Sequence, residues 1–188
     1  MKLIEIIDTL SKLSPENEKK LRSLIEQKSF RRGEIINNHN NMLSHSFYIV
    51  RGSARAFYTR NGKDHTYSFA FDDEFVMIPH MMATHPDSTM SIEFMEPTDV
   101  VFIPHARLRD SINENPYEAN LFHIAALRDY CAVLEERYLM LQNTSARERY
   151  QWVVDRYPRL LERSTITQIA SFLGVTKETI YRIRSGKY

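Results

Sequence analysis

The chain has 188 residues, of which 43% are hydrophobic, and its 25 Lys and Arg against 24 Asp and Glu give a formal net charge of +1. This length holds one domain of ordinary size and a small second one. No stretch approaches the roughly 20 apolar residues that a membrane-spanning helix needs. The single cysteine, Cys131, excludes an internal disulfide and a cysteine-based zinc or iron–sulfur site.

The first 13 residues, MKLIEIIDTLSKL, place apolar side chains at helical spacing and interrupt them with Glu5 and Asp8. This pattern predicts an amphipathic helix and not a signal peptide. We therefore expect a cytoplasmic protein.

Between about Lys28 and Pro104 the apolar pattern alternates, with turn signals at Gly33, Gly52 and Asn61-Gly62. Short strands at this spacing predict an antiparallel β-barrel or jelly roll. The strands that we expect span 46–50, 54–59, 65–71, 91–95 and 100–103.

After Pro104 the helical period returns, and residues 116–142 are predicted to form one long helix. Its apolar seam consists of Leu121, Ile124, Leu127, Cys131, Leu134, Tyr138 and Leu141. The seam is suited to pairing with the same helix of a second copy, which predicts a homodimer. The alternative is that the helix packs on its own barrel. The fold class is thus α+β: residues 1–115 hold the N-terminal helix and barrel, 116–142 the dimerisation helix, and 143–188 a helix-turn-helix.

The segment 165–184, TITQIASFLGVTKETIYRIR, has the pattern of that helix-turn-helix. Small Ala170 lies four residues before Gly174, which can adopt the positive φ of a tight turn. Thr176 follows the turn and is the predicted N-cap of the second helix. The apolar residues that the two helices would bury between them are Ile169, Leu173, Val175, Ile180 and Ile183.

Polar residues of the second helix are the predicted DNA contacts. Lys177 and Arg182 can donate to guanine, and Glu178 can accept from cytosine. Residues 145–188 hold nine Lys or Arg against four Asp or Glu, which leaves a net charge of −4 on residues 1–144. The alternative is a plain helical hairpin with a solvated basic surface. The full predicted set is Thr165, Thr176, Lys177, Glu178, Thr179, Tyr181, Arg182, Arg184 and Lys187.

The order of RRGEIINNHN, FYIVRGSARAFYTRNGKD, a long helix and ITQIASFLGVTKETIYRIR resembles the Crp/Fnr family of bacterial transcription regulators. Lys177, Glu178, Thr179 and Arg182 match the family's base-contacting positions, with Lys in place of the first Arg. The compact ending is similar to that of short members from Bacteroidetes. The resemblance implies a cyclic nucleotide-binding-like barrel, a homodimer on a palindromic operator, and RNA polymerase as a further partner.

The sequence departs from cyclic nucleotide-binding members where their barrel cradles the phosphate. The corresponding segment, roughly 73–91, lacks both the glycine and the arginine of the family pattern. From Asp64 to Phe102 there is no Lys or Arg, against eight Asp or Glu. Burying a phosphodiester without a cation is costly, so we predict no response to cyclic AMP by the family's usual chemistry.

The same region is rich in phenylalanine and in methionine, whose flexible side chain adapts to irregular shapes. It indicates either a pocket for a small effector of unidentified chemistry or an ordinary barrel core. No cofactor is expected. The predicted pocket residues are Phe71, Phe75, Met77, Ile78, Thr89, Ser91 and Tyr130.

Histidine pairs offer an alternative from another class, a cupin-type metalloenzyme. His39 and His45, or His80 and His85, are separated by five or four intervening residues instead of forming a His-x-His pair on one strand. We predict no metal site and no enzymatic activity. A ligand-binding or interaction barrel without DNA binding is the other alternative.

Overall fold

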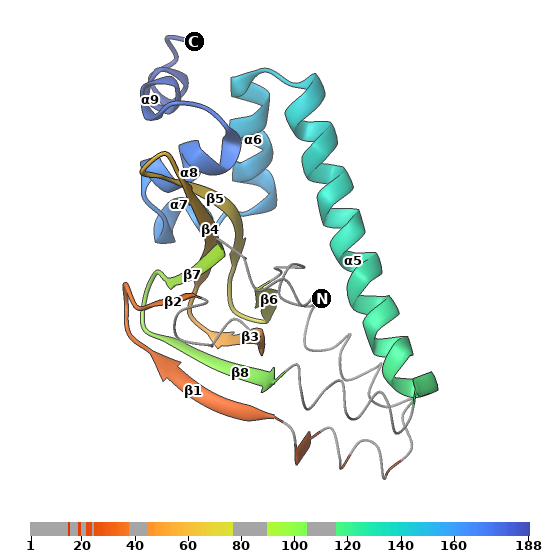
Figure 1. The fold of residues 1–188 in the computed structure, drawn as a ribbon. Helices are drawn as coiled ribbons and strands as arrows, with labels where there is room; N and C mark the ends of the chain where they lie inside the picture. Colours follow the sequence, from red (N-terminus) through yellow and green to blue (C-terminus); the bar gives the residue numbers. More distant parts are fainter. Residues whose placement is uncertain are drawn as a thin grey trace.

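The computed structural model of the protein describes residues 25–37, 45–76, 90–104 and 116–188, together with Pro15, Lys19, Arg22 and Ser23. The predicted N-terminal helix lies outside the described residues. The described part is an α+β fold in which two antiparallel sheets precede a long helix and a group of short helices (Figure 1).

The two sheets have four strands each and pack as a jelly-roll-like β-roll. One sheet has the order β1-β8-β3-β6 and the other has the order β2-β7-β4-β5. All strand pairs are antiparallel. The strands are β1 (Glu26–Phe30), β2 (Ile35–Asn37), β3 (His45–Arg51), β4 (Ala54–Arg60), β5 (Lys63–Ala70), β6 (Glu74–Val76), β7 (Met90–Phe94) and β8 (Thr98–Pro104).

The core of the β-roll receives side chains from every one of these strands, because alternate residues of each strand point inward. Phe47, Ile49, Ile92 and Phe94 are fully buried in it. The stacked rings of Phe30 and Phe94, with centroids 4.0 Å apart, join the two sheets. Hydrophobic burial of this kind is the main force that holds the sheets together.

Two turns predicted from the sequence are confirmed. Asn61 and Gly62 have φ angles of 53° and 70°, and they connect the paired residues Arg60 and Lys63. Gly52 has a φ of 113°, and a Cβ there would lie 2.5 Å from the Thr98 hydroxyl oxygen. Only glycine fits at this second position.

The β4–β5 pair contains a β-bulge that bears on the site below. Ala56 pairs with Ser68 and the next residue, Phe57, pairs with Thr66, so Tyr67 has no partner across the ladder. Because β5 ends its sheet, its other edge pairs with none of the strands that the structure describes.

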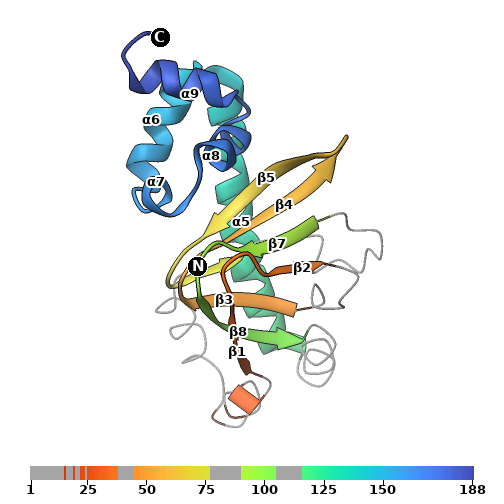
Figure 2. The same cartoon turned by 90° about the vertical axis from the view of Figure 1, so that its left-hand side faces the viewer.

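The long helix α5 (Pro116–Asn143) runs beside the β-roll, and its last turns reach the short helices (Figures 1 and 2). These form a second core around Val153, Leu160, Leu173 and Ile180. We call them the C-terminal helical unit, which comprises α6 (Ala146–Arg156), α7 (Leu160–Arg163), α8 (Ile166–Leu173) and α9 (Lys177–Arg184). None of the helices in the described part of the chain combines the length and apolar character that a membrane crossing requires.

Candidate nucleic-acid interface

Helix α8 begins with a capping box at Thr165. The Thr165 hydroxyl accepts the Gln168 N–H at 3.2 Å, and the Gln168 side-chain oxygen accepts the Thr165 N–H at 2.9 Å. These bonds satisfy two backbone donors that the first turn leaves free. Ile169, Ala170 and Leu173 are then buried on one side, as the sequence predicted.

Gly174 ends α8 in the left-handed conformation, with a φ of 66°. Its N–H donates to the Ser171 carbonyl at 3.3 Å, and the Val175 N–H donates to the Ala170 carbonyl at 3.0 Å. This is a Schellman motif, which ends the helix and satisfies two of its last carbonyls. The predicted turn is confirmed.

Thr176 precedes α9 as its N-cap, and its hydroxyl accepts the Thr179 N–H at 3.2 Å. The predicted N-cap is therefore confirmed. Ile180 is fully buried and Ile183 is partly buried in the second core. The cap and the buried side fix which face of α9 meets solvent.

The polar face of α9 is exposed at the end of the molecule remote from the β-roll (Figures 1 and 2). Glu178 and Arg182 are four residues apart and so share one face of the helix. Tyr181 is 56% exposed beside them. The predicted contacts with exposed charged or aromatic side chains are Lys177, Glu178, Tyr181, Arg182, Arg184 and Lys187.

The three threonines among the predicted contacts are engaged in the local structure. Thr165 and Thr176 cap α8 and α9, and the Thr179 hydroxyl lies 3.0 Å from the Thr176 hydroxyl. A cap can still present its backbone N–H groups to a phosphate. The exposed charged side chains of this face, unlike the threonine hydroxyls, are thus not used in capping the helices.

Arg149 on α6 joins α5 to α8, a role that sequence reasoning missed. Its guanidinium donates to the carbonyls of Leu141 at 2.9 Å, Thr144 at 3.2 Å and Leu173 at 3.3 Å. The Leu173 carbonyl lies at the C-terminal end of α8, where no helical partner exists. No local pattern marks this arginine, because its partners come from three different segments.

The predicted seam of α5 divides into two parts. Ile124, Leu127 and Tyr138 are 53%, 46% and 59% exposed, and Cys131 is exposed as well. Leu134 is half-buried, and Leu141 packs against the second core of its own chain. Leu141 therefore departs from the predicted seam, because the last turns of α5 lie against the helical unit (Figure 1). The side chain of Leu121 lies outside the described residues.

The predicted effector pocket does not form from those of its residues that are described. Phe71 is buried in the second core, with Met95 and Phe172, and not in the β-roll. Phe75 and Ser91 alternate with the buried Val76, Met90 and Ile92, so both point away from the roll core. Because the other residues of the set are not described, the pocket as a whole stays a prediction. Met77, Ile78 and Thr89 lie outside the described residues.

Tyr130, the remaining pocket candidate, touches β5 from α5. Its hydroxyl hydrogen-bonds to the hydroxyl of Tyr67, the bulge residue. Burial, followed by this hydrogen bond, raises the pKa of Tyr130 well above its usual value of 10.0. The phenol stays neutral at physiological pH and ties the long helix to the edge of the sheet.

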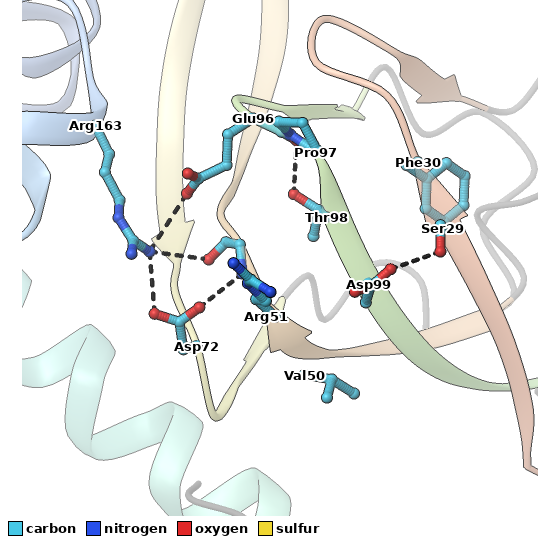
Figure 3. Close-up of a pocket in the computed structure, with 11 residues that line it drawn as sticks. Ser29, Phe30, Val50, Arg51, Asp72, Glu96, Pro97, Thr98, Asp99 and Arg163 are labelled. Atoms are coloured by element: carbon cyan, nitrogen blue, oxygen red, sulfur yellow. Dashed lines mark hydrogen bonds and ion pairs between the residues drawn. The ribbon is translucent and has the colours of Figure 1, made fainter.

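A cavity of about 920 Å³ lies between the β-roll and α7 (Figure 3). It shares no residue with the predicted pocket. Asp72 is the centre of its polar wall: Oδ1 accepts the Gly52 N–H at 2.6 Å, and Oδ2 accepts from Arg159 at 2.6 Å and Arg163 at 3.1 Å. Glu96 lies 3.3 Å from the same Arg163 nitrogen. The cavity wall is thus a charged contact between the two parts of the molecule.

The histidines that raised the enzyme alternative lie mostly outside the described residues. His45 packs edge-on against Phe102, with ring centroids 5.2 Å apart, and His39, His80 and His85 are not described. In the described ranges, three or more His, Cys, Asp or Glu side chains never gather as a metal site requires.

Comparison with known proteins gives the fold a family context. Residues 27–115 match the cyclic nucleotide-binding domain family, whereas no curated protein sequence matches the chain. A solved structure assigned to the crp/fnr family of transcriptional regulators, from Eubacterium rectale, is 16% identical over 94% of this chain and 84% of its own, with a TM-score of 0.72.

Two further solved structures are similar over most of their length. FixK2 from Bradyrhizobium japonicum is 18% identical over 86% of this chain and 83% of its own, with a TM-score of 0.68. A CooA variant from Carboxydothermus hydrogenoformans is 15% identical over 99% of this chain and 84% of its own, with a TM-score of 0.64. The chain therefore has the fold of the Crp/Fnr regulators, as its sequence motifs indicated.

Proposed function

We propose that this protein is a homodimeric transcription regulator that binds DNA in a sequence-specific manner through α9. The observation that carries the proposal is the combination of a buried Ile180 and an exposed charged face after the Thr176 cap. A short helix held in this way can enter the major groove with its N-terminal turn foremost. The fold shared with Crp/Fnr structures supports the same reading.

Each exposed side chain of α9 has a chemical role in this proposal. Lys177 and Arg182 donate to guanine O6 and N7, and Glu178 accepts from the cytosine amino group. Lys187, just beyond the helix, contacts phosphate. The Lys177 and Glu178 side chains are 57% and 66% exposed and their charged atoms are 3.9 Å apart. So weak a surface pair is readily exchanged for contacts with bases.

Dimerisation is part of the proposal because α5 exposes a stripe of apolar side chains to solvent in the single chain. Ile124, Leu127, Cys131 and Tyr138 lie along that stripe at spacings of three, four and seven residues. A two-fold axis along this stripe would place two copies of α9 on one side of a DNA duplex, about one helical turn apart.

We propose further that cyclic AMP is not the effector. Within 64–102 the sequence has no Lys or Arg, and Arg55, on β4 beside β5 and β7, is already paired with carboxylates. Its guanidinium lies 2.5 Å from Glu93 and 3.1 Å from Asp64. Freeing it for a phosphodiester would leave both acids without their cation. Calorimetry with cyclic AMP should show no micromolar binding.

The test of base reading compares two variants that lose the same charge. Arg182→Ala should weaken binding to a duplex selected by the unmodified protein by about 1–3 kcal/mol and relax preference at one base position. Arg32→Ala removes an exposed arginine from the β1–β2 turn and should change neither quantity. Equal binding and equal base preference for Arg182→Ala and the unmodified protein would contradict the assignment of α9.

A further inference from the structure

The free edge of β5 is covered by helices instead of a strand. An edge strand presents unpaired N–H and C=O groups that must find partners. Here α5 and α8 lie along this edge and supply side chains to it (Figures 1 and 2). Residues 64–67 of β5 are the part that they contact.

Ser171, on α8, pairs with this edge as a neighbouring strand would. Its hydroxyl accepts the Thr66 N–H at 2.9 Å and donates to the Asp64 carbonyl at 3.2 Å. One hydroxyl thus satisfies a donor and an acceptor of the strand. The contact joins residues 105 positions apart in the sequence.

Arg137, on α5, donates hydrogen bonds to the β5 carbonyls at the bulge. Its guanidinium donates to the carbonyl of Tyr67 and, at 3.5 Å, to that of Thr66. The same group reaches the Phe172 carbonyl of α8 at 3.4 Å. Phe172 is in the last turn of α8, where the carbonyl has no helical partner. One side chain therefore holds α5, β5 and α8 together.

Aromatic rings enclose this guanidinium. Its central carbon lies 4.6 Å from the Phe172 ring centroid and 5.3 Å from that of Tyr67. Burial lowers the pKa of Arg137, yet an arginine stays charged in proteins. A lysine has neither the planar fork nor the stacking face that this site uses.

We propose that Arg137 and Ser171 are positioning residues for DNA recognition, which hold α8 on the edge of β5 and so set the direction of α9. This rests on the proposed function of α9. The Schellman turn and the shared core of Leu173 and Ile180 make α8 and α9 one rigid piece. Whatever fixes α8 therefore fixes the recognition face.

The docking itself can be tested without DNA. In Ser171→Ala, hydrogen exchange at the Thr66 amide should accelerate by at least about tenfold, since its acceptor is lost. Gln151→Ala is the control, because that amide bonds only to Asp155 on its own helix. An unchanged Thr66 exchange rate in Ser171→Ala would show that α8 does not dock on β5 in solution.

The positioning role is tested by fluorescence anisotropy on two duplexes, the one that the unmodified protein selects from a random pool and a scrambled version. Arg137→Lys and Ser171→Ala should weaken binding to the selected duplex by about tenfold, with little change on the scrambled one. The side chains that meet DNA are intact in these variants, so only the orientation of α9 relative to the rest of the protein changes. Gln151→Ala should bind both duplexes normally.

The outcomes separate the two proposals. Equal losses on both duplexes, or none on either, would overturn the positioning role. Should Arg137→Lys fail to fold, Ser171→Ala decides, because alanine is a better helix former than serine. If the unmodified protein selects no duplex, the proposed function fails, and the exchange experiment still decides the docking of α8.

Discussion

Asp72 and Arg163 connect the β-roll to the C-terminal helical unit, with Oδ2 of the aspartate 3.1 Å from Nη1 of the arginine. The arginine also donates to the Gly52 carbonyl at 3.3 Å, while the aspartate accepts the Gly52 N–H at 2.6 Å. The backbone N–H and the carbonyl of Gly52 are thus both bound, the first by Asp72 and the second by Arg163. The pair is partly buried, with 22% and 28% of the two side chains exposed.

Removing either member of this pair should destabilise the contact between the two parts. Asp72→Asn and Arg163→Met should each lower the free energy of unfolding, and the double variant should lose less than the sum. A coupling energy of about 0.5–3 kcal/mol is expected for groups in direct contact. Urea unfolding of the four proteins measures it. Strictly additive losses would show that the two side chains do not interact in solution.

The same contact should depend on pH in the acid range. Burial acts to raise the pKa of Asp72, but the hydrogen bonds from Gly52 and Arg163 and the charges of Arg163 and Arg159 outweigh it and hold the pKa below 3.8. A depressed pKa stabilises the fold above the unfolded value and ceases to do so as pH falls through the folded value.

The difference in Tm between the unmodified protein and Asp72→Asn should therefore be constant from pH 7 to about pH 5 and shrink below pH 3.8. Thermal unfolding followed by circular dichroism across this range measures it. A difference that grows as the pH falls would contradict the sign of the effect.

Gly174 should tolerate asparagine better than alanine. Its φ of 66° strains any residue with a Cβ, although the space is open: the nearest side-chain atoms would be 3.9 Å away. Gly174→Ala should cost about 1–2 kcal/mol of stability, and Gly174→Asn less, since Asn adopts this conformation more readily. Equal stability of the glycine and alanine proteins would mean that the turn is not left-handed.

The local features of the helical pair could be predicted from sequence because their signals are local. Thr165 and Thr176 at the caps and Gly174 at the turn each act within about four residues. The strand β1 was not among the predicted strands, because of its five residues only Phe30 is buried and the apolar alternation is absent.

Contacts between distant segments could not be predicted in this way. Arg137 and Ser171 carry no local signature, and their roles depend on a bulge at Tyr67 and on how α5 meets the β-roll. The bulge changes which side chains of β5 face the roll core after it. Phe71, just beyond the strand, is buried in the second core with the helical unit and not in the core of the roll.

Dimerisation should depend on the exposed apolar stripe of α5. Leu127→Glu places a charge on that stripe, where Leu127 is 46% exposed in the single chain, and should convert the protein to a monomer. Ala132→Glu, exposed on another side of the same helix, is the control and should stay dimeric. Analytical ultracentrifugation separates the two states. A dimeric Leu127→Glu would place the subunit contact elsewhere.

The phosphate contacts should appear in the salt dependence of binding. The logarithm of the binding constant should fall linearly with the logarithm of salt concentration, and Lys187→Ala should reduce the slope by about one. Anisotropy titrations at several salt concentrations measure both slopes. An unchanged slope would remove Lys187 from the DNA interface.

Selection of duplexes from a random pool by the unmodified protein tests the DNA-binding proposal most directly. It should enrich a two-fold symmetric sequence whose half-site centres are about 10 base pairs apart, as two copies of α9 on one face of DNA require. Recovery of no enriched sequence at low ionic strength, where phosphate contacts are strongest, would contradict the proposal that α9 reads DNA.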